Sequence, residues 1–191
     1  ALALARGDYV GFLDHDDSLT PDALFSVGAE LVLNREIAVV YSDEDLISAE
    51  GEPINGHFKP DWNEDLAHAI NYICHFLVID RALVERVGGF RSGFEGAQDF
   101  DLLLRVTENL DRTSICHIPR VLYHWRAAEG STASTLANKP YAAKAGLKAL
   151  ADCVARRGLS AVAEASEIET AYRVNFQCPE PAPAVSIIVP T

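Results

Sequence analysis

The sequence predicts an α/β fold in which helices flank a Rossmann-like sheet. Residues 9–13 form a short, continuous apolar run, the pattern of a strand buried on both faces. A second such run spans residues 37–42, and between the two runs apolar side chains recur at helical spacing, at Leu24, Val27 and Leu31. Acidic residues directly follow each run. Because ligands of an open α/β sheet bind at the carboxyl ends of its strands, we expect a site there.

Local signals predict the remaining elements. Thr20 and Pro21 suit the N-cap and the first position of the first helix. Asp80 is a suitable cap for a short helix that ends at the glycine pair 88–89. Apolar runs predict further strands and periodicity predicts further helices: strands at 73–79, 115–125 and 172–177, and helices at about 98–110 and 139–157.

The charge and the cysteine content argue against several classes of protein. The 191 residues include 28 acidic and 16 basic side chains, a formal net charge of -12, whereas general nucleic-acid binding needs a basic face. No apolar run reaches the roughly 18 residues of a membrane span. The four cysteines are widely spaced and form no C-x-x-C pair, so we expect reduced core thiols and a cytoplasmic protein.

The first candidate site is the acidic cluster at residues 14–17. Asp14 and Asp16 are separated by one residue in the loop after a buried strand, so both carboxylates can face the space above that strand. Mg²⁺ and Mn²⁺ prefer such oxygen ligands and leave coordination positions open for diphosphate oxygens. The spacing alone fits equally well an Asp-rich turn that caps the following helix and binds nothing.

The second candidate is Asp99, in the segment "GAQDFDLLLR". It shares one helical face with apolar residues at 102, 103, 106 and 110, so its carboxylate should point towards the sheet. The helix dipole stabilises a carboxylate in the first turn of a helix. A helix cap and a general base are equally consistent with this position. Asp101, in contrast, is expected to pair with Arg105 one turn along.

The third candidate is "YHWR", residues 123–126, at the end of a predicted strand. The imidazole of His124 can complete a metal shell begun by carboxylates, and Arg126 can meet a phosphate. A histidine after a strand is more often simply hydrogen-bonded, so this motif alone does not decide between the two roles. The acids at 43–45, taken alone, are expected to be solvated.

Taken together, these motifs resemble glycosyltransferase family 2, a family of inverting enzymes with the GT-A fold. The resemblance lies in their combination and order: "FLDHDDSLTPDAL", then Gly-Gly-Phe at 88–90, "QD" at 98–99 and "HWR" at 124–126. The segments "YSDED" and "FKPDWNEDL" are similar to members that build bacterial surface polysaccharides, including rhamnosyltransferase-like proteins. The match covers residues 1–158, with Gln98 in place of the family's Glu.

The resemblance implies a role for each motif. Asp99 corresponds to the general base, and Asp16 and His124 correspond to ligands of a Mg²⁺ or Mn²⁺ ion on the donor's diphosphate. Further positions correspond to the donor side of the site: Asp14, Asp17, Asp43, Asp45 and Arg126. Three positions correspond to the acceptor side: Trp62, Asn71 and Gln98. The implied partners are a nucleotide-sugar donor and a glycan or lipid-linked saccharide acceptor, with peripheral contact of the parent protein at the inner face of the cell membrane.

The resemblance also implies a domain organisation. Residues 1–158 correspond to the C-terminal part of a GT-A domain that would lack its N-terminal nucleotide-binding portion. A short trailing segment follows at 159–178, then a Pro-rich linker at 179–184, and residues 185–191 are similar to the first strand of a second glycosyltransferase domain. We therefore expect an internal fragment that is inactive when isolated.

Two other functions fit part of the sequence. An aspartyl-nucleophile phosphatase also has Asp-x-Asp after a buried strand, with Asp14 as the nucleophile and Asp16 as the acid or base. That chemistry needs a lysine and a late acidic pair around the phosphate, which cannot be assigned from this sequence. The second alternative is a non-catalytic fragment that binds carbohydrate or a partner protein and ignores both Mn²⁺ and nucleotide sugars.

Overall fold

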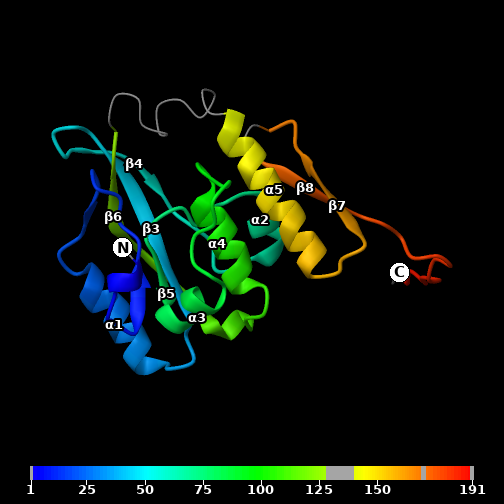
Figure 1. Ribbon diagram of the computed structural model, residues 1–191, viewed down its shortest axis with the longest axis horizontal. Helices are drawn as coiled ribbons and strands as arrows, with labels where there is room; N and C mark the ends of the chain where they lie inside the picture. The colour runs from blue at the N-terminus through cyan, green and yellow to red at the C-terminus, as the bar shows by residue number, and fades with distance from the viewer. Residues whose placement is uncertain (1, 128–139, 169–170, 190–191) are drawn as a thin grey trace.

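The computed structural model describes residues 2–127, 140–168 and 171–189, which contain a six-stranded mixed sheet (Figure 1). The strand order is β1–β5–β3–β6–β2, and β4 pairs with the second half of β3. β3 and β6 run parallel, and the other pairings in this sheet are antiparallel. The carboxyl ends of the two longest strands therefore lie at one edge of the sheet. The strands are β1 (Tyr9–Gly11), β2 (Ser18–Leu19), β3 (Val39–Ile47), β4 (Pro53–His57), β5 (Leu77–Asp80) and β6 (Ile115–Arg126).

The central strand β3 is longer than the sequence pattern predicts. The apolar run 37–42 predicts a strand that stops before the acids, whereas β3 continues through them to Ile47. The register against β6 shifts at Asp43 and again at Glu44, and such a bulge re-aims side chains. Asp43 and Glu44 are each 3% exposed, so the prediction that residues 43–45 are solvated is wrong. Histidine partners on neighbouring segments make these acids tolerable inside a strand.

The predicted cap of the helix after Asp80 is confirmed, whereas the predicted start of the first helix is wrong, because that helix begins at Ala23 with Asp22 rather than Thr20 at its N-cap. Asp80 accepts the N–H of Leu83 at 2.8 Å, as predicted for a cap, and Asn63 accepts the N–H of Leu66 at 2.9 Å. α4 lies between the sheet and α5, and the antiparallel hairpin of β7 and β8 lies beyond α5 (Figure 1). The elements are α1 (Ala23–Leu33), α2 (Glu64–Ala69), α3 (Arg81–Arg86), α4 (Gln98–Thr107), α5 (Pro140–Arg156), β7 (Ala161–Ala165) and β8 (Tyr172–Phe176), with short 3₁₀ turns at Leu2–Leu4 and Arg112–Ser114.

The main core packs α4 against the sheet. The predicted apolar face that begins at Asp99 is confirmed, because the three side chains that follow it on this face are each at most 1% exposed: Leu102, Leu103 and Val106. Asp101 pairs with Arg105 at 2.7 Å, also as predicted. Because Asp101 is fully buried and bonded to a second arginine, Arg91, this pair joins α4 to the loop before it.

Helix α1 packs two of its three predicted core residues. Val27 is 6% exposed and the partly buried Leu31 packs against the same cluster, but Leu24 is 72% exposed. Ala23 and Ser26 complete the buried face, and the helix packs against β6. The predicted periodicity was therefore right about the helix and wrong about Leu24.

Beyond β8 the described chain continues to residue 189 without a helix or strand. The apolar side chains of Val185, Ile187 and Ile188 are each more than three-quarters exposed, at 78%, 87% and 88%. Assignment of residues 185–191 to a further domain stays a prediction, and residues 190–191 lie outside the described residues. All four cysteines have free thiols, as expected, although only Cys153 is buried. None of the helices described has the length and apolar character of a membrane span.

Candidate active site

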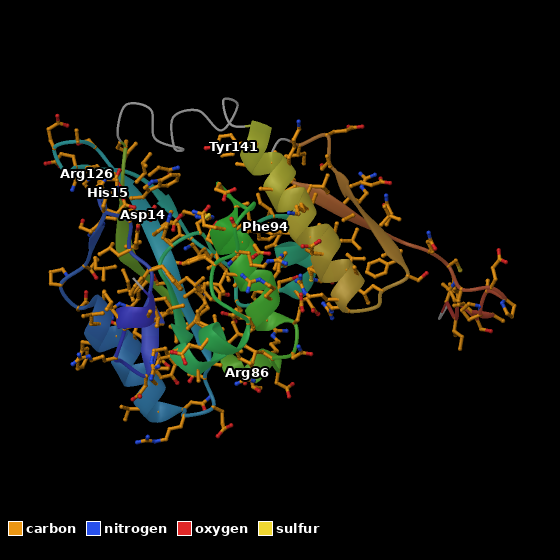
Figure 2. The ribbon with its side chains drawn as sticks, viewed as in Figure 1. Asp14, His15, Arg86, Phe94, Arg126 and Tyr141 are labelled. Carbon is orange, nitrogen blue, oxygen red and sulfur yellow. The ribbon has the colours of Figure 1, made fainter. Side chains whose placement is uncertain are left out.

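The acidic cluster 14–17 lies in the loop between β1 and β2. Because β2 pairs with the end of β6, and Ser18 lies opposite His124, this loop is brought beside the "YHWR" motif. Figure 2 shows Asp14, His15 and Arg126 at one end of the sheet and Arg86 at the other. Two of the three sequence motifs therefore meet at one edge of the sheet.

Tyr123 anchors the acidic loop from the core side. Its side chain is fully buried, and its hydroxyl donates to the Asp17 carboxylate and accepts the N–H of Asp14 at 3.2 Å. The N–H of Arg126 donates to the other Asp17 oxygen at 2.8 Å. Burial, together with the hydrogen bond to Asp17, raises the pKa of Tyr123, so the hydroxyl remains a donor. Asp17 thus fixes the loop, whereas the side chain of Asp14 is 70% exposed.

The guanidinium of Arg126 is bound to backbone carbonyls. Its Nε donates to the Asp16 carbonyl at 3.0 Å, and its Nη1 donates to the carbonyls of Ser48 and Ala49 at 3.2 and 3.1 Å. The side chain therefore ties the acidic loop to the turn between β3 and β4. The Asp16 carboxylate remains 39% exposed, 3.6 Å from the ring of His15. Contact of Arg126 with a donor phosphate stays a prediction.

His124 and Asp45 are cross-strand neighbours on β6 and β3. The Asp45 carboxylate lies 2.6 Å from Nδ1 of His124, so Nε2 is the ring nitrogen that remains for a ligand. Metal-bound histidines usually have such a carboxylate on their other nitrogen, which fixes the ring orientation. The arrangement of Asp45 and His124 is therefore compatible with a metal role for His124.

His75, which the sequence did not indicate, lies at the centre of the site. Its ring stacks on Tyr123 with a centroid separation of 4.7 Å, and its Nε2 is 3.9 Å from an oxygen of Asp14. Ligand atoms of Asp14, Asp17 and His75 all lie within 4.8 Å of one another. Two carboxylates and one imidazole suit a divalent cation, although this set contains neither Asp16 nor His124, the ligands that the resemblance implies.

A buried ion pair holds the segment that carries His75. The Lys59 ammonium lies 3.1 Å from Oε2 of Glu44, with side-chain exposures of 0% and 3%. The same oxygen accepts the N–H of His75 at 2.8 Å, and the ammonium donates to the His75 carbonyl. Burial lowers the pKa of Lys59. Burial would raise the pKa of Glu44, but His57, His75 and Lys59 outweigh it and lower that pKa.

Asp99 lies in the first turn of α4, where the amide of Asn71 donates to its Oδ2 at 2.8 Å. Burial raises the pKa of Asp99, although the bond from Asn71 and the charge of His75 oppose the rise. Burial disfavours the charged form of His75, but the carboxylates of Glu44, Asp14 and Asp99 outweigh burial and raise its pKa. His75 is therefore coupled electrostatically to two acids that the sequence assigned to separate motifs.

Hydrogen bonds within the fold hold the side chains of Asp43 and Gln98. Buried Asp43 accepts the N–H of Lys59 and lies against Nε2 of His117, both at 2.9 Å. The exposed Gln98 accepts the N–H of Gly96 at 2.7 Å through its side-chain oxygen. These contacts give both side chains a structural role. The roles of Asp43 towards the donor and of Gln98 towards the acceptor stay predictions.

Trp62 lies in the core rather than beside the acidic loop. Its side chain is 9% exposed, and its ring packs beside that of Tyr72 with a centroid separation of 6.3 Å. It lines two surface hollows of about 330 and 400 Å³ that also share Arg112. The smaller hollow includes Ile115, the first residue of β6, so it lies at the opposite end of that strand from His124. An acceptor role for Trp62 stays a prediction.

The sequence is similar to proteins of bacterial polysaccharide synthesis. It is 44% identical over 189 residues to the O-antigen biosynthesis protein RfbC of Myxococcus xanthus, and 48% identical over 192 residues to y4gI of Sinorhizobium fredii, an uncharacterised protein. These matches cover 98% and 100% of this chain but only 14% and 21% of those proteins, so the chain spans about a fifth of their length or less. The chondroitin synthase of Escherichia coli is 31% identical over 109 residues, 56% of this chain and 16% of the synthase.

Two solved structures share the fold. Mannosyl-3-phosphoglycerate synthase from Rubrobacter xylanophilus matches with a TM-score of 0.51 and 14% identity, covering 92% of this chain and 59% of the synthase. Residues 1–349 of Staphylococcus aureus TarS match with a TM-score of 0.50 and 16% identity, covering 81% of this chain and 49% of TarS. No family model matches the chain. The chain is therefore a homologue of proteins of bacterial polysaccharide synthesis, and its fold is the GT-A fold of glycosyltransferases, as its motifs implied.

Proposed function

We propose that this chain carries the catalytic edge of an inverting glycosyltransferase of family 2. The enzyme transfers a sugar from a nucleotide-sugar donor to a glycan or lipid-linked saccharide during synthesis of a bacterial surface polysaccharide. The relatives in polysaccharide synthesis support this class of reaction. The observation that carries the proposal is that one short segment contacts both motifs: Asn71 donates to Asp99 at 2.8 Å, and Nε2 of His75 lies 3.9 Å from Asp14.

Asp99 is the general base in this proposal. It takes the proton from an acceptor hydroxyl, whose oxygen attacks the anomeric carbon of the donor sugar from the face opposite the diphosphate. The bond from that carbon to the diphosphate oxygen breaks, and the anomeric configuration is inverted. A raised pKa brings a carboxylate closer to the pH at which a base works best, and the bond from Asn71 holds Asp99 in one orientation.

Asp16 and His124 would hold a Mg²⁺ or Mn²⁺ ion, with Asp14 and Asp17 beside them on the donor side. Such an ion, when bound, neutralises negative charge on the departing diphosphate. Two features support the assignment: the exposed carboxylate of Asp16, and the Asp45 carboxylate that orients the His124 ring. Tyr123 contributes by fixing the loop through Asp17.

The test is Asp99→Asn in the full-length parent protein. Transfer should fall by about 10²–10⁴-fold, the usual contribution of a general base, while calorimetric binding of Mn²⁺ and of the nucleotide sugar is retained. Asp111→Asn, an exposed carboxylate beyond the same helix, is the matched control and should leave transfer unchanged. Transfer by Asp99→Asn near the wild-type rate would show that another group is the base. A parent that bound neither Mn²⁺ nor any nucleotide sugar would instead be a non-catalytic carbohydrate or partner binder.

A further inference from the structure

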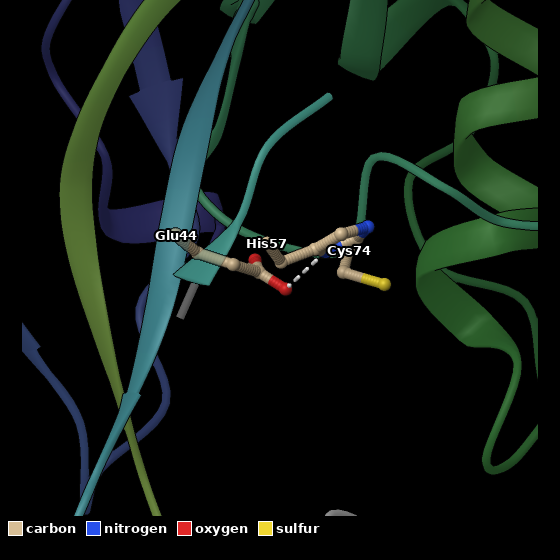
Figure 3. A group of neighbouring side chains, drawn as sticks. All are labelled: Glu44, His57 and Cys74. Carbon is tan, nitrogen blue, oxygen red and sulfur yellow. Dashed lines mark hydrogen bonds and ion pairs between the residues drawn. The ribbon is translucent and has the colours of Figure 1, made fainter. Parts of the chain in front are cut away.

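Glu44, His57 and Cys74 bring three potential metal ligands of different chemistry near one another (Figure 3). Glu44 and His57 lie directly opposite each other in the register of β3 and β4, with Oε1 and Nδ1 separated by 3.0 Å. Cys74 comes from the segment before β5. One ligand atom from each of the three residues lies within 4.8 Å of the other two.

The fold itself brings Cys74 to this pair. The N–H of the next residue, His75, donates to Oε2 of Glu44, and the carbonyl of His75 accepts from Lys59. Cys74 has a φ of 46°, a left-handed conformation that is unfavourable for a residue with a Cβ atom. Its thiol lies 3.2 Å from the Asn71 carbonyl, to which it donates. These backbone contacts hold Cys74 so that its thiol lies within 4.8 Å of a ligand atom of Glu44 and of His57.

We propose that Glu44, His57 and Cys74 form a second metal site, suited to a zinc-class cation rather than to Mg²⁺ or Mn²⁺. A thiolate, an imidazole and a carboxylate are all established zinc ligands, whereas Mg²⁺ and Mn²⁺ favour sites made of oxygen. Zinc bond lengths of about 2.0–2.3 Å in a tetrahedron separate neighbouring ligand atoms by about 3.4–3.6 Å. The ligand atoms of His57 and Glu44 are 3.0 Å apart, which is closer than this spacing, and the limit for the whole set is 4.8 Å, which is wider. The side chains would therefore have to move by about 1 Å to bind zinc.

The charges around the site set its strength. Lys59 occupies Oε2 of Glu44, so the cation would use Oε1, which faces His57. Burial raises the pKa of the Cys74 thiol to about 12, so metal binding must release a proton. Repulsion by the Lys59 ammonium and the cost of deprotonating Cys74 should make zinc binding weaker here than at a site with several thiolates. The side chain of His57 is 46% exposed, which gives the metal an entry path and leaves the fourth position to water.

The site differs from the proposed donor-metal site in both ligands and consequence. It shares no ligand with the pair Asp16 and His124, so each site can be removed without the other. Metal bound to Cys74 would join the end of β4 to the segment that carries Asn71 and His75. The second site would therefore stabilise the segment that carries Asn71 and His75 without contacting the substrate.

The test is a zinc titration of this chain, freed of metal by a chelator, against a competing chromophoric chelator. The wild type should bind one Zn²⁺ that Mn²⁺ does not displace, and Cys74→Ser and His57→Ala should each weaken binding by about 10-fold or more. Substituted Co²⁺ should show a thiolate charge-transfer band that Cys74→Ser removes. Cys116→Ser, which replaces a half-buried thiol on β6, is the matched control and should bind Zn²⁺ like the wild type.

Each outcome decides the proposal independently of the glycosyltransferase function. Wild-type protein that binds no Zn²⁺, or variants at 57 and 74 that bind it unchanged, would overturn the second site. If Cys74→Ser does not fold, His57→Ala decides alone, because this half-exposed side chain is not part of the core. A failed transfer assay in the parent would overturn the proposed reaction and leave the zinc result untouched.

Discussion

Replacing Lys59 by methionine should destabilise the protein strongly, because it leaves the Glu44 carboxylate buried without its cation. The two side chains are 0% and 3% exposed, so water cannot take the place of the lost partner. Removal of one member of a buried ion pair typically costs about 3–5 kcal/mol. The carbonyls of Ser42 and His75 lose their donor in the same variant. For a protein of this size the expected fall in Tm is about 6–20 °C.

The assay is urea unfolding followed by circular dichroism at pH 7, with a chelator present so that bound metal does not contribute. The free energy of unfolding of Lys59→Met is compared with that of Glu85→Gln, which breaks the exposed pair with Arg81. The control should change stability by at most about 0.5 kcal/mol, as exposed i,i+4 pairs do. A loss below about 1 kcal/mol for Lys59→Met would refute the reasoning that this pair is desolvated and holds the His75 segment.

Three further predictions concern the same edge of the sheet. The folded-state pKa of Glu44 lies below its ordinary value, so its stabilisation is complete above about pH 4.3 and declines as pH falls. The urea-measured stability gap between wild type and Glu44→Gln should therefore narrow in acid, and a constant gap would contradict this. Tyr123→Phe removes a hydroxyl bonded to a carboxylate and should lower the free energy of unfolding by about 1.5–3 kcal/mol, whereas unchanged urea unfolding would argue against that anchor. Asn71→Ala removes a hydrogen bond that lowers the pKa of Asp99, so the acidic limb of the pH–rate profile of the full-length parent should move to higher pH. An unchanged acidic limb would show that Asn71 does not influence the pKa of the base.

Features that depend on neighbours along the chain could be predicted from the sequence. Asp80 caps α3 through a residue three positions away, and Asp101 pairs with Arg105 four positions away. The apolar face that follows Asp99 on α4 was predicted for the same reason, because helical geometry fixes which side chains share a face. The acidic loop after the first strand and the histidine at the end of β6 also follow from local pattern.

Features that depend on the pairing of distant segments could not be predicted. Local periodicity placed the end of the second strand at residue 42, because it contains no sign of the partners that stabilise Asp43 and Glu44 inside β3. Lys59 lies in a segment without regular periodicity, and His75 lies in the predicted strand at 73–79, so no sequence signal marked either residue as part of a site. Leu24 was wrongly assigned to the core because a short helical stripe does not fix how the helix is rotated against the sheet.

The sequence by itself determined the class of fold, the order of the motifs and the kinds of chemistry that Asp14–Asp17, Asp99 and His124 can perform. These depend on residue type and on spacing within one element. Only the tertiary structure decided that Tyr123 fixes Asp17, that Asp45 faces His124 and that Glu44 joins Lys59 to His75. The reason is that strand register, including the bulge at Asp43 and Glu44, selects which distant side chains meet.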